Sequence, residues 1–107
     1  AAAAVSFTQT FQDAAHSNIS ATLNMQEFAA RLSRSDVRFV HVSTAFVHGG
    51  CSGTKSAPLG ENLFHLGAYD ALELYESMVS TEFMAAKAFR ELKFPNTYTF
   101  SKCVCEH

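Results

Sequence analysis

The sequence predicts an α/β fold, in which parallel strands are joined by helices that cross over them. Apolar residues open the chain, and a β-branched and aromatic run follows over residues 37–42, as expected for two buried strands. Between and after these runs, apolar residues recur at steps of three and four over about residues 13–32 and 69–92, as on amphipathic helices. Strand, helix, strand, helix is the order of a parallel sheet covered by helices.

The first half of the chain is expected to hold a strand end, a helix and a second strand. Residues 1–7 begin with four alanines and fit the end of a buried strand that enters a loop. A helix should follow from about residue 13 to 32, and residues 33–36 make the turn after it. His41 lies within the second strand pattern and is expected in the core.

The second half is expected to be mainly helical. A glycine-rich stretch over residues 49–53 and a polar loop follow the second strand. The next helix covers about residues 69–92, and residues 94–96 (FPN) end it, because proline does not continue a helix. A last helix then begins near Thr97 or Tyr98.

Length and composition limit the range of functions. The 107 residues suit one small domain or a part of one, and 48% of them are hydrophobic, enough for a core. The formal charge of −2 leaves no basic patch, so we expect no nucleic-acid partner. No apolar run approaches the roughly 18 residues that span a bilayer. The chain opens on Ala1 and is still helical in pattern at His107, so we expect a piece of a longer protein whose other segments could associate with a membrane.

The three cysteines predict neither a disulfide framework nor a metal site. Cys51, Cys103 and Cys105 are an odd, sparse set, typical of reduced thiols inside a cell. Cys103, Cys105 and His107 alternate, but residues two apart on a helix face away from each other, and the chain has no second ligand pair.

Four residues in order along the chain point to acid–base chemistry. Tyr98 and Lys102 are four apart and therefore share one helix face. The ammonium stabilises the phenolate form of the tyrosine, which can then exchange a proton with a carbonyl or alcohol oxygen. Thr44 follows a buried strand, where ligands gather in open α/β sheets, and Asn18 lies in the first helix. A Tyr-x-x-x-Lys spacing alone is common by chance, so the prediction depends on the combination.

Four segments resemble one family. Residues 39–47 (FVHVSTAFV) resemble the "HVSTAYV" segment of fatty acyl-CoA reductases and their bacterial thioester-reductase relatives. Residues 95–102 (PNTYTFSK) resemble the "PNTYTFTKALAE" signature of that family. Residues 2–7 (AAAVSF) are similar to its "AAxVxF", and residues 18–22 (NISAT) to the "NVxGT" of extended short-chain dehydrogenases/reductases. The segments follow the family's order.

The resemblance implies a partial Rossmann-like fold, a doubly wound parallel sheet of which residues 1–107 are the central part. The chain has no G-x-G-x-x-G, so the glycine-rich turn of the NAD(P)-binding domain is expected before Ala1 and the substrate part after His107. The isolated chain should then be inactive. Sugar-nucleotide epimerases and dehydratases usually have a shorter gap than the 54 positions between Thr44 and Tyr98. We therefore expect residues 57–93 to be an insertion with a part in substrate preference.

The resemblance also implies a role for each site residue. Tyr98 would donate the proton, and Lys102 would stabilise its phenolate and bind the nicotinamide ribose. Thr44 stands five before Gly49, as the hydroxyl that holds the substrate carbonyl does in the family. Further implied roles are cofactor contacts from Ala2, Ala3 and Tyr98, substrate contacts from Ser43 and His48, and the positioning of a water by Asn18.

The implied reaction is the NADPH-dependent reduction of a fatty acyl-CoA thioester. A first hydride transfer gives a hemithioacetal that collapses to aldehyde and free CoA, and a second gives the alcohol. Tyr98 and Thr44 would stabilise the oxyanion, while the cofactor supplies the hydride. The location is intracellular, with the peroxisome or the endoplasmic reticulum membrane as options in a eukaryote.

Other functions stay open at this point. One is a thioester-reductase domain that releases a carrier-bound acyl chain, a second is a nucleotide-sugar epimerase or dehydratase, and a third is a non-catalytic module of the same fold. Residues 49–56 (GGCSGTKS) nearly match a phosphate-binding loop, but Thr54 replaces its second glycine and residues 57–60 are a poor first helical turn. We expect a mobile active-site loop there, in which Lys55 could contact a phosphate.

Overall fold

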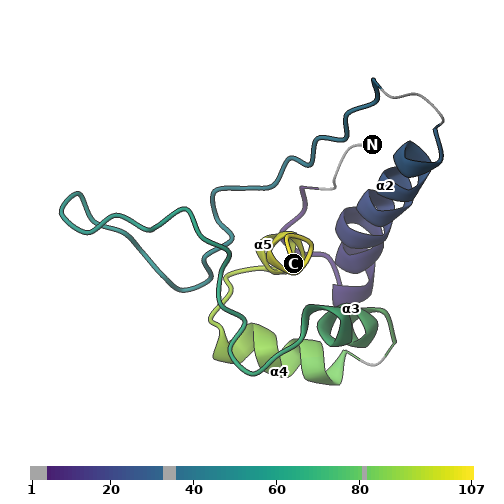
Figure 1. Ribbon diagram of the computed structural model, residues 1–107. Coiled ribbons are helices and arrows are strands. Elements are labelled where there is room, and N and C mark those ends of the chain that lie inside the picture. Colours follow the sequence, from purple (N-terminus) through teal and green to yellow (C-terminus); the bar gives the residue numbers. More distant parts are fainter. Residues whose placement is uncertain (1–4, 33–35, 81) are drawn as a thin grey trace.

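The computed structural model describes residues 5–32, 36–80 and 82–107. The helices in chain order are α1 (Phe11–Ala14), η1 (Ala15–Ser20), α2 (Ala21–Arg31), α3 (Ala71–Ser80), α4 (Phe83–Glu91) and α5 (Thr97–Val104). Helix α5 lies at the centre of the helical body, and a loop within residues 36–70 extends away from it (Figure 1).

The first three helices form one continuous run, which confirms the helix predicted over about residues 13–32. The side chain of Thr10 caps its start, because Thr10 Oγ1 accepts a hydrogen bond from the amide of Asp13 at 3.1 Å. The middle of the run, η1, is a π-helical turn that contains Asn18. Such wider turns occur inside α-helices and are frequent at functional sites.

The strand predicted over residues 37–42 is not formed. The segment has no regular structure and no backbone pairing within the described residues, and a strand exists only where a neighbour supplies its hydrogen bonds. Lys102 anchors the segment instead, since its Nζ donates to the carbonyl oxygen of Val42 at 2.7 Å. The residues that the structure describes thus form helices and loops, and the expected α/β fold is not confirmed by it. Of the strand end predicted over residues 1–7, residues 1–4 lie outside the described ranges, and residues 5–7 form no strand.

The single helix predicted over about residues 69–92 is wrong in its middle, where two helices form. Glu82 precedes α4 with a φ of 57°, a left-handed conformation that no residue adopts inside a helix. The amide of Glu82 donates to the carbonyl of Ser77 at 2.6 Å, and Ser77 Oγ accepts from the amide of Ala85 at 3.0 Å. These bonds fold α4 back on α3, and the two pack as a hairpin. No glycine or proline marks the break in the sequence, and the apolar residues keep their helical spacing across it. The pattern therefore predicted one helix where two form.

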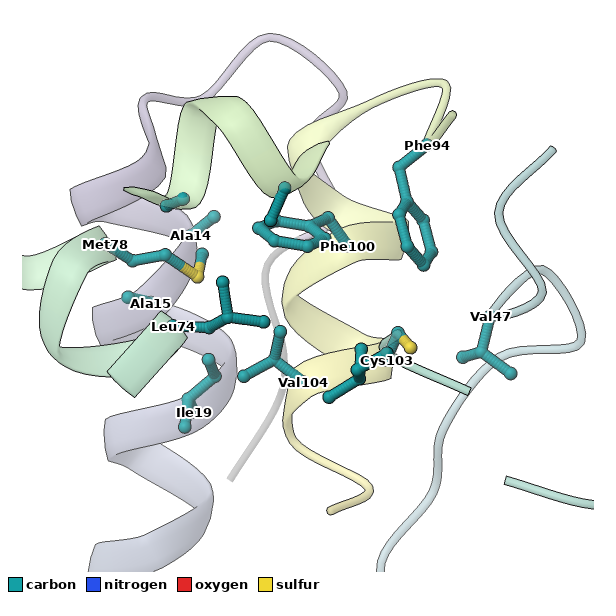
Figure 2. Packing of buried hydrophobic residues seen from close by; sticks show 13 residues of the cluster. Ala14, Ala15, Ile19, Val47, Leu74, Met78, Phe94, Phe100, Cys103 and Val104 are labelled. Atoms are coloured by element: carbon teal, nitrogen blue, oxygen red, sulfur yellow. The ribbon is translucent and has the colours of Figure 1, made fainter. Parts of the chain in front are cut away.

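The core lies between α5 and the helices around it (Figure 2). Phe100 of α5 is fully buried, and its ring meets the edges of Phe11 and Phe89 at centroid distances of 6.0 and 5.7 Å. Leu74 and Met78 of α3 are also fully buried in this cluster. The segment expected to be an insertion therefore forms part of the core that supports α5.

Helix α5 begins as predicted and ends earlier than predicted. Asn96 caps it, with Oδ1 accepting from the amide of Thr99 at 2.9 Å. The helix ends at Val104, whereas the sequence pattern was expected to continue to His107. Across the described ranges, none of the helices is long and apolar enough to cross a membrane.

Candidate active site

Helix α5 presents the two residues that were predicted to handle protons. Tyr98 and Lys102 both line a cavity of about 550 Å³ that is also bounded by residues of α2 and of the segment 38–43. Tyr98 is half-buried, whereas Lys102 is 3% exposed. The structure thus brings the pair to one cavity, and their catalytic roles stay predictions.

The ammonium of Lys102 is buried against a neutral group. Its Nζ donates to the carbonyl of Val42 at 2.7 Å, and no carboxylate lines the cavity. An ammonium has three N–H donors, so one bond to a carbonyl leaves donors for a ligand. Lysine side chains are almost never buried to this degree, so Lys102 is a candidate functional residue.

Ser43 and Thr44 face different hollows. Ser43 lines the cavity of Tyr98, and its Oγ is shielded from solvent with no hydrogen-bond partner in the described structure. Thr44 lines a second hollow of about 510 Å³ together with His48, and its Oγ1 accepts from the amide of Phe46 at 3.4 Å. Successive side chains of an extended backbone point to opposite sides, which accounts for this division.

His41 is a cavity residue that sequence reasoning assigned to the core. It lines the same cavity as Ser43, and its Nε2 is shielded from solvent without a partner in the described structure. Burial lowers the pKa of His41, the positive charge of Lys102 lowers it further, and the smaller opposing effect of Glu106 does not reverse this. The ring is therefore neutral at pH 7 and can accept a hydrogen bond. The alternation of His41 with Ser43 in an extended segment was the signal that could have revealed it.

Asn18 lies behind α5 and not in the cavity wall. Its side chain is fully buried, and Nδ2 donates to Ser101 Oγ at 2.9 Å. Ser101 Oγ in turn donates to the carbonyl of Tyr98 at 2.9 Å. The carbonyl of Asn18 accepts from Thr22 Oγ1 and Cys105 Sγ, and its Oδ1 is buried without a partner in the described structure. The π-helical turn is thereby fastened to the turn of α5 that carries Tyr98.

The two hollows differ in charge. The cavity of Tyr98 is lined by the cations Arg38 and Lys102 and by no Asp or Glu, in a chain whose net charge is −2. The hollow of Thr44 is lined by Glu61 and Glu106 and by no Lys or Arg. A cavity lined by one sign of charge favours ligands of the opposite sign, so the first suits an anionic ligand and the second does not.

Of the remaining predicted residues that the structure describes, His48 and Lys55 do not line the cavity of Tyr98. Ala2 and Ala3, predicted to contact the cofactor, lie outside the described residues. His48 meets the edge of the Phe64 ring at 6.0 Å. Residues 51–70 form no helix, so the near-match to a phosphate-binding loop at residues 49–56 lacks the helix N-terminus that such a loop requires. The side chain of Lys55 in this stretch is exposed. The described residues contain no cluster of three His, Cys, Asp or Glu side chains that could hold a metal ion.

Comparison with known proteins identifies the kind of domain. A model of the NAD-binding family described as "Male sterility protein" matches residues 1–107, the full length of the chain. No curated protein and no solved structure matches the chain significantly. The match indicates a nicotinamide cofactor and an oxidoreductase that depends on NAD or NADP.

Proposed function

The chain belongs to the Male sterility protein family of NAD-binding domains, and we propose that it takes part in the NADPH-dependent reduction of a fatty acyl-CoA thioester. The observation that carries this proposal is the shared cavity of Tyr98, Lys102 and Ser43 in a chain of this family. The substrate class comes from the resemblance of residues 39–47 and 95–102 to fatty acyl-CoA reductases.

We propose that the 107 residues are the central part of a Rossmann-like reductase domain. The family match covers the full chain, while the chain has no G-x-G-x-x-G turn. Val40 and Val42 are 77% and 76% exposed and alternate with His41 and Ser43, which are half-buried. This alternation is typical of a strand with one face on helices, and neighbouring strands would complete it.

The cavity fits a nicotinamide dinucleotide in charge and in hydrogen-bonding groups. Its cations suit the phosphates, and Lys102 has N–H donors left for a ribose hydroxyl. The Nε2 of His41 and the Oγ of Ser43 are buried polar atoms that a polar ligand would satisfy. The cofactor supplies the hydride when it is bound.

The side chains of Tyr98, Lys102 and Ser43 would stabilise and protonate the oxygen of the substrate carbonyl. As the carbonyl carbon is reduced, its oxygen gains negative charge and takes a proton from Tyr98 Oη. The ammonium of Lys102 stabilises the phenolate that is left. Ser43 Oγ donates a hydrogen bond to the same oxygen, a contribution of about 3–4 kcal/mol for a well-placed donor. Because Thr44 lines the other hollow, it would contact a different part of the substrate.

The test is the substitution Tyr98→Phe in the complete protein. We expect turnover of a long-chain acyl-CoA with NADPH to fall at least about 100-fold, because the proton donor is lost. The affinity for NADPH should change no more than about twofold, since the ring remains and only the hydroxyl is gone.

Tyr75→Phe is the matched control, because Tyr75 is also half-buried and its hydroxyl is bonded to Ser20 Oγ at 2.9 Å, away from the cavity. This control should keep normal turnover. A Tyr98→Phe protein that still reduces the acyl-CoA at the wild-type rate would contradict the proposal. A wild-type protein that binds NADPH but reduces no acyl thioester would contradict the substrate class.

A further inference from the structure

Ser101 links two parts of the molecule that lie far apart in the sequence. It is fully buried in α5, and its Oγ accepts from Asn18 Nδ2 and donates to the carbonyl of Tyr98, each at 2.9 Å. A serine that bonds a carbonyl of its own helix is a common local pattern. The bond from Asn18 is not local, because 83 positions separate the two residues.

The two bonds of Ser101 act on the helical turn that carries the site. The bond from Ser101 Oγ to the carbonyl of Tyr98 holds the backbone of Tyr98. Lys102 directly follows Ser101, so the same part of the helix carries both residues of the site. The other bond fixes that turn against η1, which has no side-chain cap of its own and carries the fully buried Asn18. Ser101 itself lines neither hollow, so it touches no ligand there and can act only through its neighbours.

We propose that Ser101 is a positioning residue, which holds the first turn of α5 so that Tyr98 Oη and Lys102 Nζ meet the substrate in one cavity. This inference rests on the proposed reductase function. A shift of about 1 Å at a reacting group can cost roughly 100-fold in rate, so a small rotation of this turn has a large effect. The Lys102–Val42 bond fixes the end of the lysine side chain, and the Asn18–Ser101 bond fixes the helix that carries it.

The experiment compares Ser101→Ala with Ser101→Thr in the complete protein. The alanine removes the acceptor for Asn18 Nδ2 and the donor to the Tyr98 carbonyl, and we expect kcat to fall about 10- to 100-fold. The KM for acyl-CoA and the Kd for NADPH should stay within about threefold, because no ligand contact is removed. The threonine keeps the hydroxyl, as in the resembled "PNTYTFTK" motif, and should restore most of kcat.

Ser77→Ala is the matched control for a merely structural role. Ser77 is 6% exposed in α3, and its Oγ accepts from the amide of Ala85, far from the cavity. Its loss should lower the Tm while kcat, measured below the Tm, stays unchanged. A Ser101→Ala protein whose kcat falls no more than that of Ser77→Ala overturns the inference, as does a folded threonine variant that stays as slow as the alanine variant.

Two further variants, Ser101→Cys and Tyr98→Phe, distinguish a failure of the positioning role from a failure to fold and from a failure of the proposed function. If Ser101→Ala does not fold, Ser101→Cys keeps the volume with a weaker hydrogen-bonding group, and an unchanged kcat in that variant overturns the inference. Tyr98→Phe is assayed beside the Ser101 variants. If Tyr98→Phe is inactive and Ser101→Ala is fully active, only the positioning role fails. If Tyr98→Phe is fully active, the proposed function fails.

Discussion

Ser43 and Thr44 are neighbours in the sequence, yet their side chains line different hollows. The resemblance to the reductases assigned the carbonyl-binding role to Thr44, by its distance of five residues from Gly49. The geometry favours Ser43, because its Oγ is buried beside the cavity of Tyr98 without a partner in the described structure. A bond to the substrate oxygen would satisfy that hydroxyl, since buried polar groups in proteins are nearly always paired.

Single alanine substitutions separate these two assignments. We expect Ser43→Ala to lower kcat about 100- to 1000-fold, as the loss of one oxyanion donor does. Thr44→Ala should mainly raise the KM for acyl-CoA, because its hollow does not include Tyr98. Steady-state kinetics of the complete protein at saturating NADPH measures both effects. If Thr44→Ala lowers kcat strongly and Ser43→Ala leaves kcat unchanged, Thr44 and not Ser43 binds the substrate carbonyl.

At the scale of the element, helix α5 was predictable because its signals are local. Proline does not continue a helix, so Pro95 separates α5 from α4, which ends at Glu91. Asn96 is a strong N-cap, and Tyr98 and Lys102 share a face whatever surrounds them. The break between α3 and α4 was not predictable, because it depends on the backbone at Glu82 and the Ser77 bonds, with no glycine or proline to mark it. The π-helical turn at Asn18 likewise leaves no trace in the apolar spacing.

The N-cap of α5 gives a prediction for this element. Asn96→Ala should lower the free energy of unfolding by about 1 kcal/mol, because the amide of Thr99 loses the side-chain acceptor at 2.9 Å. Asn96→Asp keeps an acceptor at the same position and adds a negative charge near the helix N-terminus, so it should be as stable as the wild type. Urea unfolding followed by circular dichroism measures both. Equal stability of the alanine and aspartate variants would show that the cap contributes nothing.

At the scale of the whole molecule, the hairpin of α3 and α4 and the first helical run pack against α5. Its core residue Phe100 contacts both Phe11 and Phe89, and these two rings also contact each other at a centroid distance of 5.4 Å. Tyr75 and Gln12 add hydrogen bonds between these parts, to Ser20 Oγ at 2.9 Å and to the carbonyl of Val79 at 3.2 Å. The helices of the segment that was expected to have a part in substrate preference thus belong to the core that supports α5. Spacing along the sequence could not show this, because it depends on which helices pack together.

The extended segment provides the test of the proposed sheet. Its exposed valines, Val40 and Val42, are large apolar side chains that a soluble fold normally covers. In a Rossmann-like domain, strands on both sides would also bind the backbone amides of residues 39–43, and pairing of this kind slows hydrogen exchange strongly. The helices alone give no such protection, since the segment has no backbone pairing within the described residues.

Hydrogen exchange of the complete protein, read by mass spectrometry, distinguishes the two arrangements. We expect peptides that cover residues 39–43 to exchange as slowly as those of α5, whose amides are paired within the helix. Peptides from the exposed loop at residues 51–60 should exchange within seconds and serve as the internal control. If residues 39–43 exchange as fast as that loop, the segment is not a strand. The site would then be built from helices and one extended segment, and Lys102 would be the group that holds that segment in place.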